Sequence, residues 1–295
     1  MRFPGIIPAV TTPFDEDLAI DFDGLEANLA ALLEAGVHGL VATGTMGEAG
    51  SLDRAERATV VAAVVRAAGG RVPVIAGVSS GTPELSLGYA EDARAAGADA
   101  LMLLPPLGYR GDPDELVAFF AAVADGAGLP VMAYNNPEAS GVDLPPMLIA
   151  RLAAEVEGVV AIKECSGDAR RLSALSGAAP GLELLVGGDD WALEGFCAGA
   201  TGWVSGVAVC VPADCLELYE ACRAADLERA RSVYARLLPL ARLDMTPKLV
   251  QYFKGAQDAL GLVGGPVRRP RLPLPPAEQA VLEVALAALR APAPA

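Results

Sequence analysis

Short apolar runs alternate with amphipathic segments along most of this chain. The apolar runs lack the polar alternation of a half-exposed strand, so they are typical of strands buried on both faces of a parallel sheet. Between the runs, apolar residues recur at helical spacing, as Leu25, Leu29 and Leu32 do between Asp21 and Gly36. The predicted strands lie within residues 5–14, 39–45, 72–78, 100–104, 130–134, 158–167, 182–186 and 202–209.

A helix is predicted after each strand, so the pattern consists of eight strand-then-helix units. The helices begin near Asp21, Asp53, Pro83, Asp112, Pro146, Asp168, Trp191 and Pro212. Eight such units predict an α/β fold, a (β/α)8 TIM barrel. A doubly wound sheet is the alternative, and it is disfavoured because no strand is followed by a GxGxxG or P-loop sequence.

The last quarter of the chain reads as helical, with helices expected over 227–240, 247–260 and 278–289. No linker in it is long enough to separate an independent module. We therefore predict two parts, a catalytic barrel over 1–224 and a C-terminal helical region over 225–295 that packs on the barrel.

Composition narrows the class of partner. The net charge of −15 and the pI near 4.5 argue against a nucleic-acid partner, which requires a basic surface. No apolar run is long enough to cross a membrane without Gly, Pro or a charge. Pro4 and Pro8 interrupt the N-terminal segment, which therefore does not resemble a signal peptide.

The five cysteines, Cys165, Cys197, Cys210, Cys215 and Cys222, are odd in number and form no CxxC pair. This argues against a disulfide framework and against a zinc site. Reduced cysteines predict a cytoplasmic protein.

The run from Gly158 to Gly167 holds the most unusual residue of the chain. Its sequence, GVVAIKECSG, predicts a buried strand with Lys163 near its end. Burial lowers the pKa of a lysine, and the neutral amine forms Schiff bases with carbonyls. Lysine occurs elsewhere only at Lys248 and Lys254, the other basic residues being arginine. The alternative is a lysine that reaches from the strand end to a surface carboxylate.

Polar residues gather where several predicted strands end, which in a TIM barrel is the active-site face. They include Thr11-Thr12, Thr45 to Glu48, Tyr134 to Asn136, Lys163-Glu164 and Gly188 to Asp190. The turn Gly44-Thr45-Met46-Gly47 offers backbone N–H groups and a hydroxyl suited to a carboxylate; the alternative is an ordinary β-to-α turn.

Tyr134 can relay a proton between substrate and water, or it is a core tyrosine with a satisfied hydroxyl. His38, the only histidine, lies before a strand and is read as structural. A single histidine makes a Ser/His/Asp triad or a His-rich metal site improbable. Asp189-Asp190 is predicted to cap the following helix, and no metal is expected there.

Four segments, taken together in order and spacing, resemble the dihydrodipicolinate synthase / N-acetylneuraminate lyase family of class I aldolases. They are Gly44-Thr45-Met46-Gly47-Glu48, Tyr134-Asn135-Asn136-Pro137 with Gly141, Ile162-Lys163-Glu164 and Gly188-Asp189-Asp190. The resemblance extends from Gly5 to about Leu274. It implies a TIM barrel with a C-terminal helical region, usually a homotetramer, and we expect a homotetramer or homodimer.

The resemblance also implies roles for single residues. Lys163 would form a Schiff base with C2 of a 2-oxo acid, Tyr134 would shuttle a proton, and Thr45 with the backbone at Met46 would hold the substrate carboxylate. We accordingly assign catalysis to Lys163, Tyr134 and Thr45. Substrate contacts are assigned to Gly44, Met46, Gly47, Asn136, Gly188 and Val204. No cofactor and no metal are implied.

The chain departs from the lysine-pathway synthases of this family at three positions. Met46 stands where those synthases have a second threonine, and Leu107 where they have a tyrosine from the neighbouring subunit. Ala139 replaces an arginine that grips the carboxylate of the aldehyde substrate. Tyr109, two residues after Leu107, is a candidate replacement for the missing tyrosine. N-acetylneuraminate lyase fits poorly too, because its polar sugar-binding pattern is absent.

Three segments look most like the Δ1-pyrroline-4-hydroxy-2-carboxylate deaminase branch, which acts in hydroxyproline breakdown. They are 134–137, 187–194 and 243–252. That reaction converts a cyclic imino acid to 2,5-dioxopentanoate and ammonia and has no second acidic substrate, which fits the missing arginine. We predict this activity on a small 2-oxo or cyclic imino acid. The alternatives are 4-hydroxy-tetrahydrodipicolinate synthase or another pyruvate-dependent aldolase, and a non-catalytic 2-oxo-acid sensor.

Overall fold

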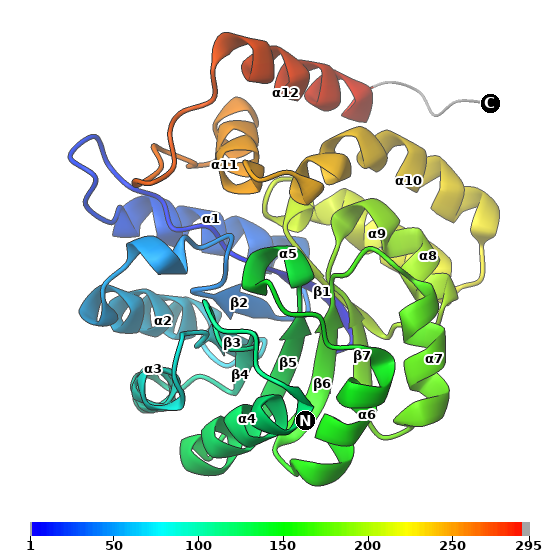
Figure 1. Ribbon diagram of the computed structural model, residues 1–295. Coiled ribbons are helices and arrows are strands. Elements are labelled where there is room, and N and C mark those ends of the chain that lie inside the picture. Colours follow the sequence, from blue (N-terminus) through cyan, green and yellow to red (C-terminus); the bar gives the residue numbers. More distant parts are fainter. Residues whose placement is uncertain (1, 291–295) are drawn as a thin grey trace.

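Eight parallel strands form the centre of the computed structural model, which describes residues 2–290 (Figure 1). Each strand is buried, as the apolar runs predict. The strands are β1 (Gly5–Pro8), β2 (Leu40–Ala42), β3 (Val74–Gly77), β4 (Ala100–Leu103), β5 (Val131–Asn135), β6 (Val159–Glu164), β7 (Glu183–Val186) and β8 (Gly202–Ser205).

The strands pair in the order β1-β8-β7-β6-β5-β4-β3-β2, every ladder being parallel. The remaining seam, between β1 and β2, is closed by a bridge from Ala9 to Val41 and by the amide of Val10, which donates to the Val41 carbonyl at 2.9 Å. The (β/α)8 TIM-barrel prediction is therefore confirmed, with one seam that is only lightly paired.

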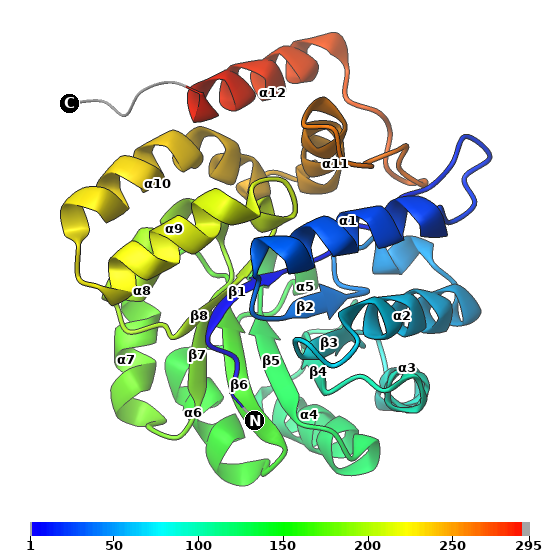
Figure 2. The same cartoon turned by 180° about the vertical axis from the view of Figure 1, so that it is seen from behind.

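Helices cover the outside of the barrel and its C-terminal end (Figure 2). They are α1 (Phe22–Ala35), α2 (Arg54–Ala68), α3 (Pro83–Ala96), α4 (Pro113–Ala127), α5 (Pro137–Ser140), α6 (Pro146–Glu155), α7 (Arg170–Ala178), α8 (Ala192–Cys197), α9 (Pro212–Arg223), α10 (Leu227–Ala241), α11 (Leu249–Ala259) and α12 (Pro276–Leu289). Short 3-10 helices are η1 (Ala49–Ser51), η2 (Asp189–Trp191), η3 (Val207–Val209) and η4 (Arg242–Met245).

Local capping explains why several helices begin where the sequence predicts. Asp21 accepts a hydrogen bond from the Gly24 amide at the start of α1. Asp53 and Glu56 form a capping box at the start of α2, in which each side chain accepts from the backbone of the other. α3 and α6 begin with proline, whose missing N–H costs nothing in the first turn.

The predicted first and last strands are longer than the observed ones. Residues 202–209 divide into β8 and the 3-10 helix η3. The carboxylate of Asp189 accepts hydrogen bonds from the amides of Gly206 (3.2 Å) and Val207 (2.6 Å), so these donors are not available to a neighbouring strand. The predicted role of Asp189 as a helix cap is wrong, because its side chain reaches into β8 and η3 instead.

The C-terminal helices lie against one side of the barrel and reach its C-terminal end. α10 packs on α9 and α12, and α11 packs on α12 and η3. The ion pair of Lys248 with Glu278 (2.6 Å) joins the start of α11 to α12. The division of the chain at residue 224 stays a prediction.

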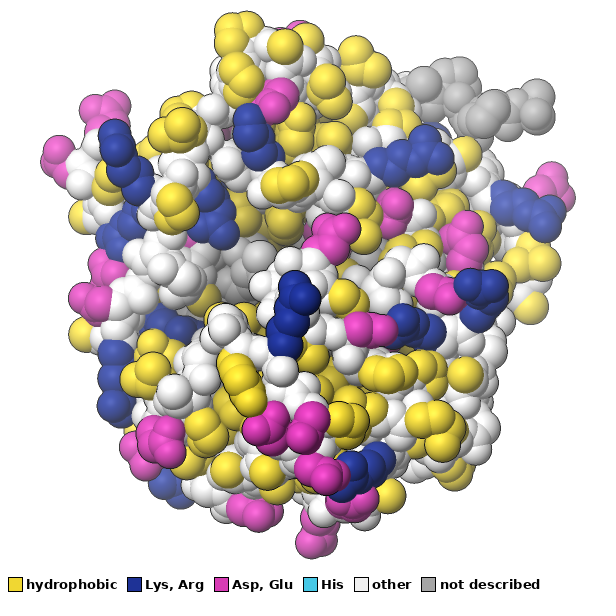
Figure 3. Space-filling model, viewed as in Figure 1, with side chains coloured by type: hydrophobic (Ala, Val, Ile, Leu, Met, Phe, Trp, Pro, Cys, Tyr) yellow, Lys and Arg dark blue, Asp and Glu magenta, His cyan; other side chains and the backbone are white. Residues whose placement is uncertain are grey.

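The outer surface carries mixed charges. On the face shown in Figure 3, acidic and basic side chains are interspersed with apolar ones, and no extended basic patch is visible. Among residues 2–290, no helix is both long enough and apolar enough to cross a membrane.

Candidate active site

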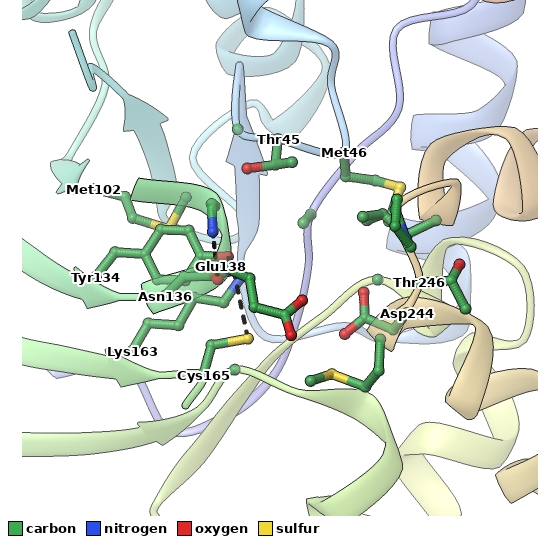
Figure 4. Close-up of a pocket in the computed structure, with 18 residues that line it drawn as sticks. Thr45, Met46, Met102, Tyr134, Asn136, Glu138, Lys163, Cys165, Asp244 and Thr246 are labelled. Carbon is green, nitrogen blue, oxygen red and sulfur yellow. Dashed lines mark hydrogen bonds between the residues drawn. The ribbon is translucent and has the colours of Figure 1, made fainter. Parts of the chain in front are cut away.

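A pocket of about 270 Å³ opens at the C-terminal ends of the strands, the face on which the sequence places its polar residues. Its walls come from the strands β4, β5 and β6, from the turns after β2, β7 and β8, and from the helix α5. The segment from η4 to the start of α11 completes it with Asp244, Met245, Thr246, Pro247 and Leu249. Lys163, Tyr134, Thr45, Gly44, Met46 and Asn136 all line this pocket (Figure 4).

Lys163 and Tyr134 are direct neighbours on adjacent strands. They are paired in the register of β5 and β6, and the Lys163 ammonium lies 4.2 Å from the centre of the Tyr134 ring. The Lys163 side chain is only 6% exposed. It points into the pocket and does not reach a surface carboxylate, which excludes the alternative of a lysine extended to the surface.

The residues next along each strand form a buried network on the opposite face. Asn135 is paired with Glu164 in the register, and its amide donates to the Glu164 carboxylate at 3.0 Å. Glu164 also accepts from the Ser166 amide at 2.6 Å, and the Leu144 amide donates to Asn135 at 2.9 Å. Because side chains alternate along a strand, fixing Asn135 and Glu164 also fixes the directions of Tyr134 and Lys163.

The protonation of Lys163 differs from the prediction. Burial alone would lower its pKa, but Tyr134, Cys165 and Asp244 outweigh burial, and the pKa of Lys163 is raised. Of these three groups only Asp244 is an anion at neutral pH, because burial raises the pKa of Tyr134 to about 12 and also raises the pKa of Cys165. The direction of this shift argues against the expected resting neutral amine and favours the ammonium form of Lys163.

Asn136 positions the tyrosine as well as lining the pocket. Its amide donates to the Tyr134 hydroxyl oxygen at 2.9 Å and lies 3.7 Å from the Cys165 sulfur. The side-chain oxygen of Asn136 accepts a hydrogen bond from the Ala139 amide at 3.0 Å, and Asn136 thereby caps α5. The Tyr134 hydroxyl keeps its proton available for a substrate in the pocket.

The turn after β2 is held in place by the segment that follows β1. The Thr12 hydroxyl donates to the Gly47 carbonyl at 2.8 Å, and a Cβ at Gly47 would lie 3.0 Å from the Val10 carbonyl oxygen. Thr43 and Glu48, which flank the turn, both adopt left-handed φ angles of about 50° (52° and 53°). Backbone strain of this kind persists only where the surroundings enforce it, and here it occurs on both sides of the turn that carries Thr45.

Glu48 anchors this turn to the C-terminal helical region. Its carboxylate is fully buried and lies 2.9 Å from the ammonium of Lys254, a residue of α11 that is 2% exposed. Lys254 also donates to the Thr12 carbonyl at 2.9 Å, and the Arg268 amide donates to Glu48 at 3.1 Å. The turn after β2 is thus fastened to residues more than two hundred positions later in the chain.

Three of the predicted contact residues, Gly47, Gly188 and Val204, do not line the pocket. Gly187 and Gly206 line it instead of Gly188 and Val204, and Gly47 belongs to the turn that carries Thr45 and Met46. A Cβ at Gly187 would lie 2.9 Å from Cγ of Lys163, so glycine leaves room for that side chain. Gly188 faces the Trp191 indole instead, and Val204 is buried in β8 opposite Ile7.

Sequence reasoning missed the acidic residues of the pocket. Glu138 of α5 and Asp244 of η4 both line it, and Figure 4 shows both carboxylates turned into the space above Lys163. Burial raises the pKa of Asp244 to about 6, although Lys163 works in the opposite direction. In the sequence, segment 243–252 stands out only for its likeness to one branch of the family. Nothing in the strand-and-helix pattern places that segment at the ends of the strands.

Of the three positions that differ from the lysine-pathway synthases, two lie in the pocket and one lies on the surface. Met46 and Ala139 line the pocket, so the missing threonine and arginine are absent from the site itself. Leu107 and Tyr109 are exposed at 40% and 54%, and the Tyr109 hydroxyl donates to Glu115 at 3.0 Å. Tyr109 does not line the pocket of its own chain.

His38 lies at the other end of the barrel, as predicted. Its Nδ1 accepts a hydrogen bond from the Ile6 amide at 3.1 Å, and its ring packs against Tyr219. The five cysteines are unpaired thiols. Within residues 2–290, His, Cys, Asp and Glu side chains form no group of three that could hold a metal ion.

A closed parallel barrel with a lysine pocket at the C-terminal ends of its strands defines a TIM-barrel enzyme of the class I aldolase and lyase type. The family model described as "Dihydrodipicolinate synthetase family" matches residues 2–289. The chain belongs to this family.

Relatives and solved structures agree with this assignment. A 4-hydroxy-tetrahydrodipicolinate synthase of Methanopyrus kandleri is 37% identical over 272 residues, covering 91% of this chain and 90% of the relative. A "4-hydroxy-tetrahydrodipicolinate synthase 2" of Streptomyces coelicolor is 38% identical over 287 residues, covering 97% and 95%. YagE, an Escherichia coli K12 prophage protein of the same family solved in complex with pyruvate, superposes with a TM-score of 0.92 at 29% identity, covering 98% of this chain and 99% of that one.

Proposed function

We propose that this protein is a class I lyase that forms a Schiff base between Lys163 and C2 of a small 2-oxo acid. The observation that carries the proposal is the buried Lys163 ammonium, 4.2 Å from the ring centre of Tyr134, in a pocket at the barrel's active-site face. A lysine amine and an adjacent proton-transfer group are what imine formation and enamine chemistry require.

The chemistry begins with positioning and proton removal. The turn Gly44–Gly47, with the Thr45 hydroxyl, receives the substrate carboxylate, which directs C2 toward Lys163. The Lys163 ammonium must lose a proton to become a nucleophile. The Asp244 carboxylate in the pocket can accept this proton, although the same carboxylate raises the pKa of Lys163. The amine adds to C2, and the resulting carbinolamine expels water to give the iminium ion.

The next step creates a nucleophilic carbon. Loss of a proton from C3 of the iminium ion leaves an enamine, in which the former C3–H electron pair forms the C2–C3 double bond. The Tyr134 hydroxyl, oriented by Asn136, relays that proton to and from water. Final hydrolysis of the imine releases the product and restores the Lys163 amine.

The comparisons favour a pyruvate-dependent reaction. Relatives at 34–38% identity are named 4-hydroxy-tetrahydrodipicolinate synthase, and YagE was solved with pyruvate. We therefore take condensation of pyruvate with an aldehyde as the first candidate for the complete reaction.

The deaminase predicted from the sequence becomes the second candidate, since no relative described above carries that name. One observation favours it. Ala139 lies in the pocket where the synthases have their arginine, and apart from Lys163 the pocket wall has no basic side chain. A cyclic imino acid needs no partner for a second carboxylate.

Borohydride trapping tests the proposed function. We expect the protein, incubated with pyruvate and borohydride, to gain one covalent adduct that peptide mass spectrometry places on Lys163. Ammonia release from Δ1-pyrroline-4-hydroxy-2-carboxylate and consumption of pyruvate with an aldehyde then separate the two candidate reactions. Absence of any adduct on Lys163 with both substrates would contradict the proposal, and an adduct without turnover would favour the sensor.

Tyr134→Phe removes the proposed proton relay while keeping the ring against Lys163. Exchange of the pyruvate methyl protons with heavy water, followed by NMR, reports C3 proton transfer directly. We expect the exchange rate to fall about a hundredfold or more, the usual contribution of a positioned acid–base group. Tyr219→Phe, at the far end of the barrel beside His38, is the matched control and should exchange at the normal rate. Equal rates in both variants would rule out the relay.

A further inference from the structure

Two acidic side chains form part of the pocket wall. Glu138 approaches from α5 and Asp244 from η4, and both carboxylates face the cavity (Figure 4). The Thr246 hydroxyl lies on the same side, and no arginine lines the pocket. The only cation in the wall is Lys163, which the proposed chemistry consumes.

Asp244 is fixed in place and does not move freely on a loop. Its carboxylate accepts a hydrogen bond from the Asp189 amide at 3.2 Å. The Asp189 carboxylate in turn is fully buried and accepts from the Trp203 indole at 2.9 Å as well as from the Gly206 and Val207 amides. A Cβ at Gly206 would lie 3.0 Å from the Asp244 carboxylate, so glycine gives Asp244 its space.

Asp244 loses a nearby positive charge during the reaction. In the resting protein Lys163 lowers the pKa of Asp244, but burial outweighs this effect and the pKa is about 6. The nitrogen of Lys163 carries no charge once the iminium ion has become an enamine. The carboxylate then keeps only its hydrogen bond from the Asp189 amide, so a cation or a hydrogen-bond donor on the substrate is favoured at this stage.

We infer that Asp244 and Glu138 select 2-oxo acids whose far end carries an amine or a hydroxyl group, and reject those whose far end is a carboxylate. This inference rests on the proposed function, because it requires the substrate carbonyl at Lys163. A second carboxylate would face two like charges with no basic residue to balance them, and like-charge contacts cost several kcal/mol.

Cyclic imino acids belong to the selected class. When the Lys163 amine adds to C2 of a five-membered cyclic imine, the bond from C2 to the ring nitrogen breaks. That nitrogen takes up both protons of the lysine amine, one on addition and one on ring opening, and remains attached to C5 as a primary amine. It takes a further proton from water to become an ammonium group at neutral pH, and Asp244 and Glu138 are the carboxylates of the pocket that can receive it.

The inference is tested by calorimetric binding of four ligands of similar length, which does not depend on turnover. They are Δ1-pyrroline-2-carboxylate, 4-hydroxy-2-oxopentanoate, 2-oxopentanoate and 2-oxoglutarate. We expect the cyclic imine and the hydroxy acid to bind at least about tenfold more tightly than 2-oxoglutarate, with 2-oxopentanoate between them. Equal or tighter binding of 2-oxoglutarate would overturn the inference, as would binding that requires an added divalent cation.

Variants assign the selectivity to the two residues. In the double variant Glu138→Gln with Asp244→Asn, the cyclic imine and the hydroxy acid should bind only about threefold more tightly than 2-oxoglutarate, or less. Glu157→Gln, an exposed carboxylate before β6, is the control and should keep the selectivity. If the double variant does not fold, Glu138→Gln alone, at an exposed position, must still narrow the preference. Borohydride trapping with pyruvate separates the two levels: no Lys163 adduct defeats the proposed function, whereas an adduct with unchanged selectivity in these variants defeats only this inference.

Discussion

Lys163→Ala should abolish both the borohydride adduct and the exchange of pyruvate methyl protons, by more than about a thousandfold in rate. No other lysine lines the pocket, so no other amine can form the imine. Lys163→Arg should be equally inactive, because a guanidinium keeps its proton and cannot add to a carbonyl. The measurements are mass spectrometry after reduction and NMR in heavy water.

Lys248→Ala provides the control for this result. Lys248 is partly exposed, pairs with Glu278 and does not line the pocket, so its loss should leave adduct formation unchanged. An adduct that persists in Lys163→Ala and disappears in Lys248→Ala would overturn the assignment of the nucleophile.

Lys254→Met should produce the largest loss of stability. It removes the nearer of two cations from the fully buried Glu48 carboxylate and leaves only Arg271, at 3.7 Å. Breaking a buried pair costs about 3–5 kcal/mol, and we expect a loss toward the lower end of that range. Burial lowers the pKa of Lys254, while Glu48 acts in the opposite direction. The charged form of Lys254 therefore depends on Glu48 to offset the loss of water. Urea unfolding followed by circular dichroism measures the difference in free energy.

Two further variants make this stability prediction specific. Glu48→Leu combined with Lys254→Met should recover part of the loss, because the unpaired charge is gone. Arg170→Met removes an exposed ion pair with Asp168 and should change stability by less than about 1 kcal/mol. A Lys254→Met protein as stable as Arg170→Met would contradict the importance of the buried pair.

The fold could be predicted because its determinants are local. Strand and helix periods, and capping residues such as Asp21 and Asp53, act within a few neighbours along the chain. Lys163 and Tyr134 could be placed in one pocket for a related reason: parallel strands bring their C-terminal ends to one face. Strand lengths were less predictable, since β8 ends where a distant side chain, Asp189, captures its amides.

What could not be predicted depends on contacts between distant segments. Asp244 enters the pocket from η4, and no sequence period relates η4 to β6. The pKa of Lys163 is raised by Tyr134, Cys165 and Asp244 together, against the effect of burial, and such neighbours from separate segments are not evident in the sequence. Gly187 lines the pocket and Gly188 does not, so one position along the chain is enough to move a residue out of the pocket wall.

The sequence identified the family more securely than it identified the reaction. The segments around Thr45, Tyr134 and Lys163 identified the family, and the family match confirms it. The three segments that suggested a deaminase, 134–137, 187–194 and 243–252, each contribute at least one residue to the pocket wall, namely Tyr134, Gly187 and Asp244. A match in these segments therefore does not by itself identify the reaction, because the whole family can share a lysine pocket.

The fastening of Glu48 to Lys254 has an evolutionary consequence. Residues 242–268 supply both Asp244 of the pocket wall and the anchor of the turn after β2. We expect substitutions in this one segment to change the pocket wall while the strands that carry Lys163 and Tyr134 stay unchanged. When related genes recombine, this segment and the turn after β2 should be inherited together, because otherwise the buried Glu48 carboxylate loses its nearer cation.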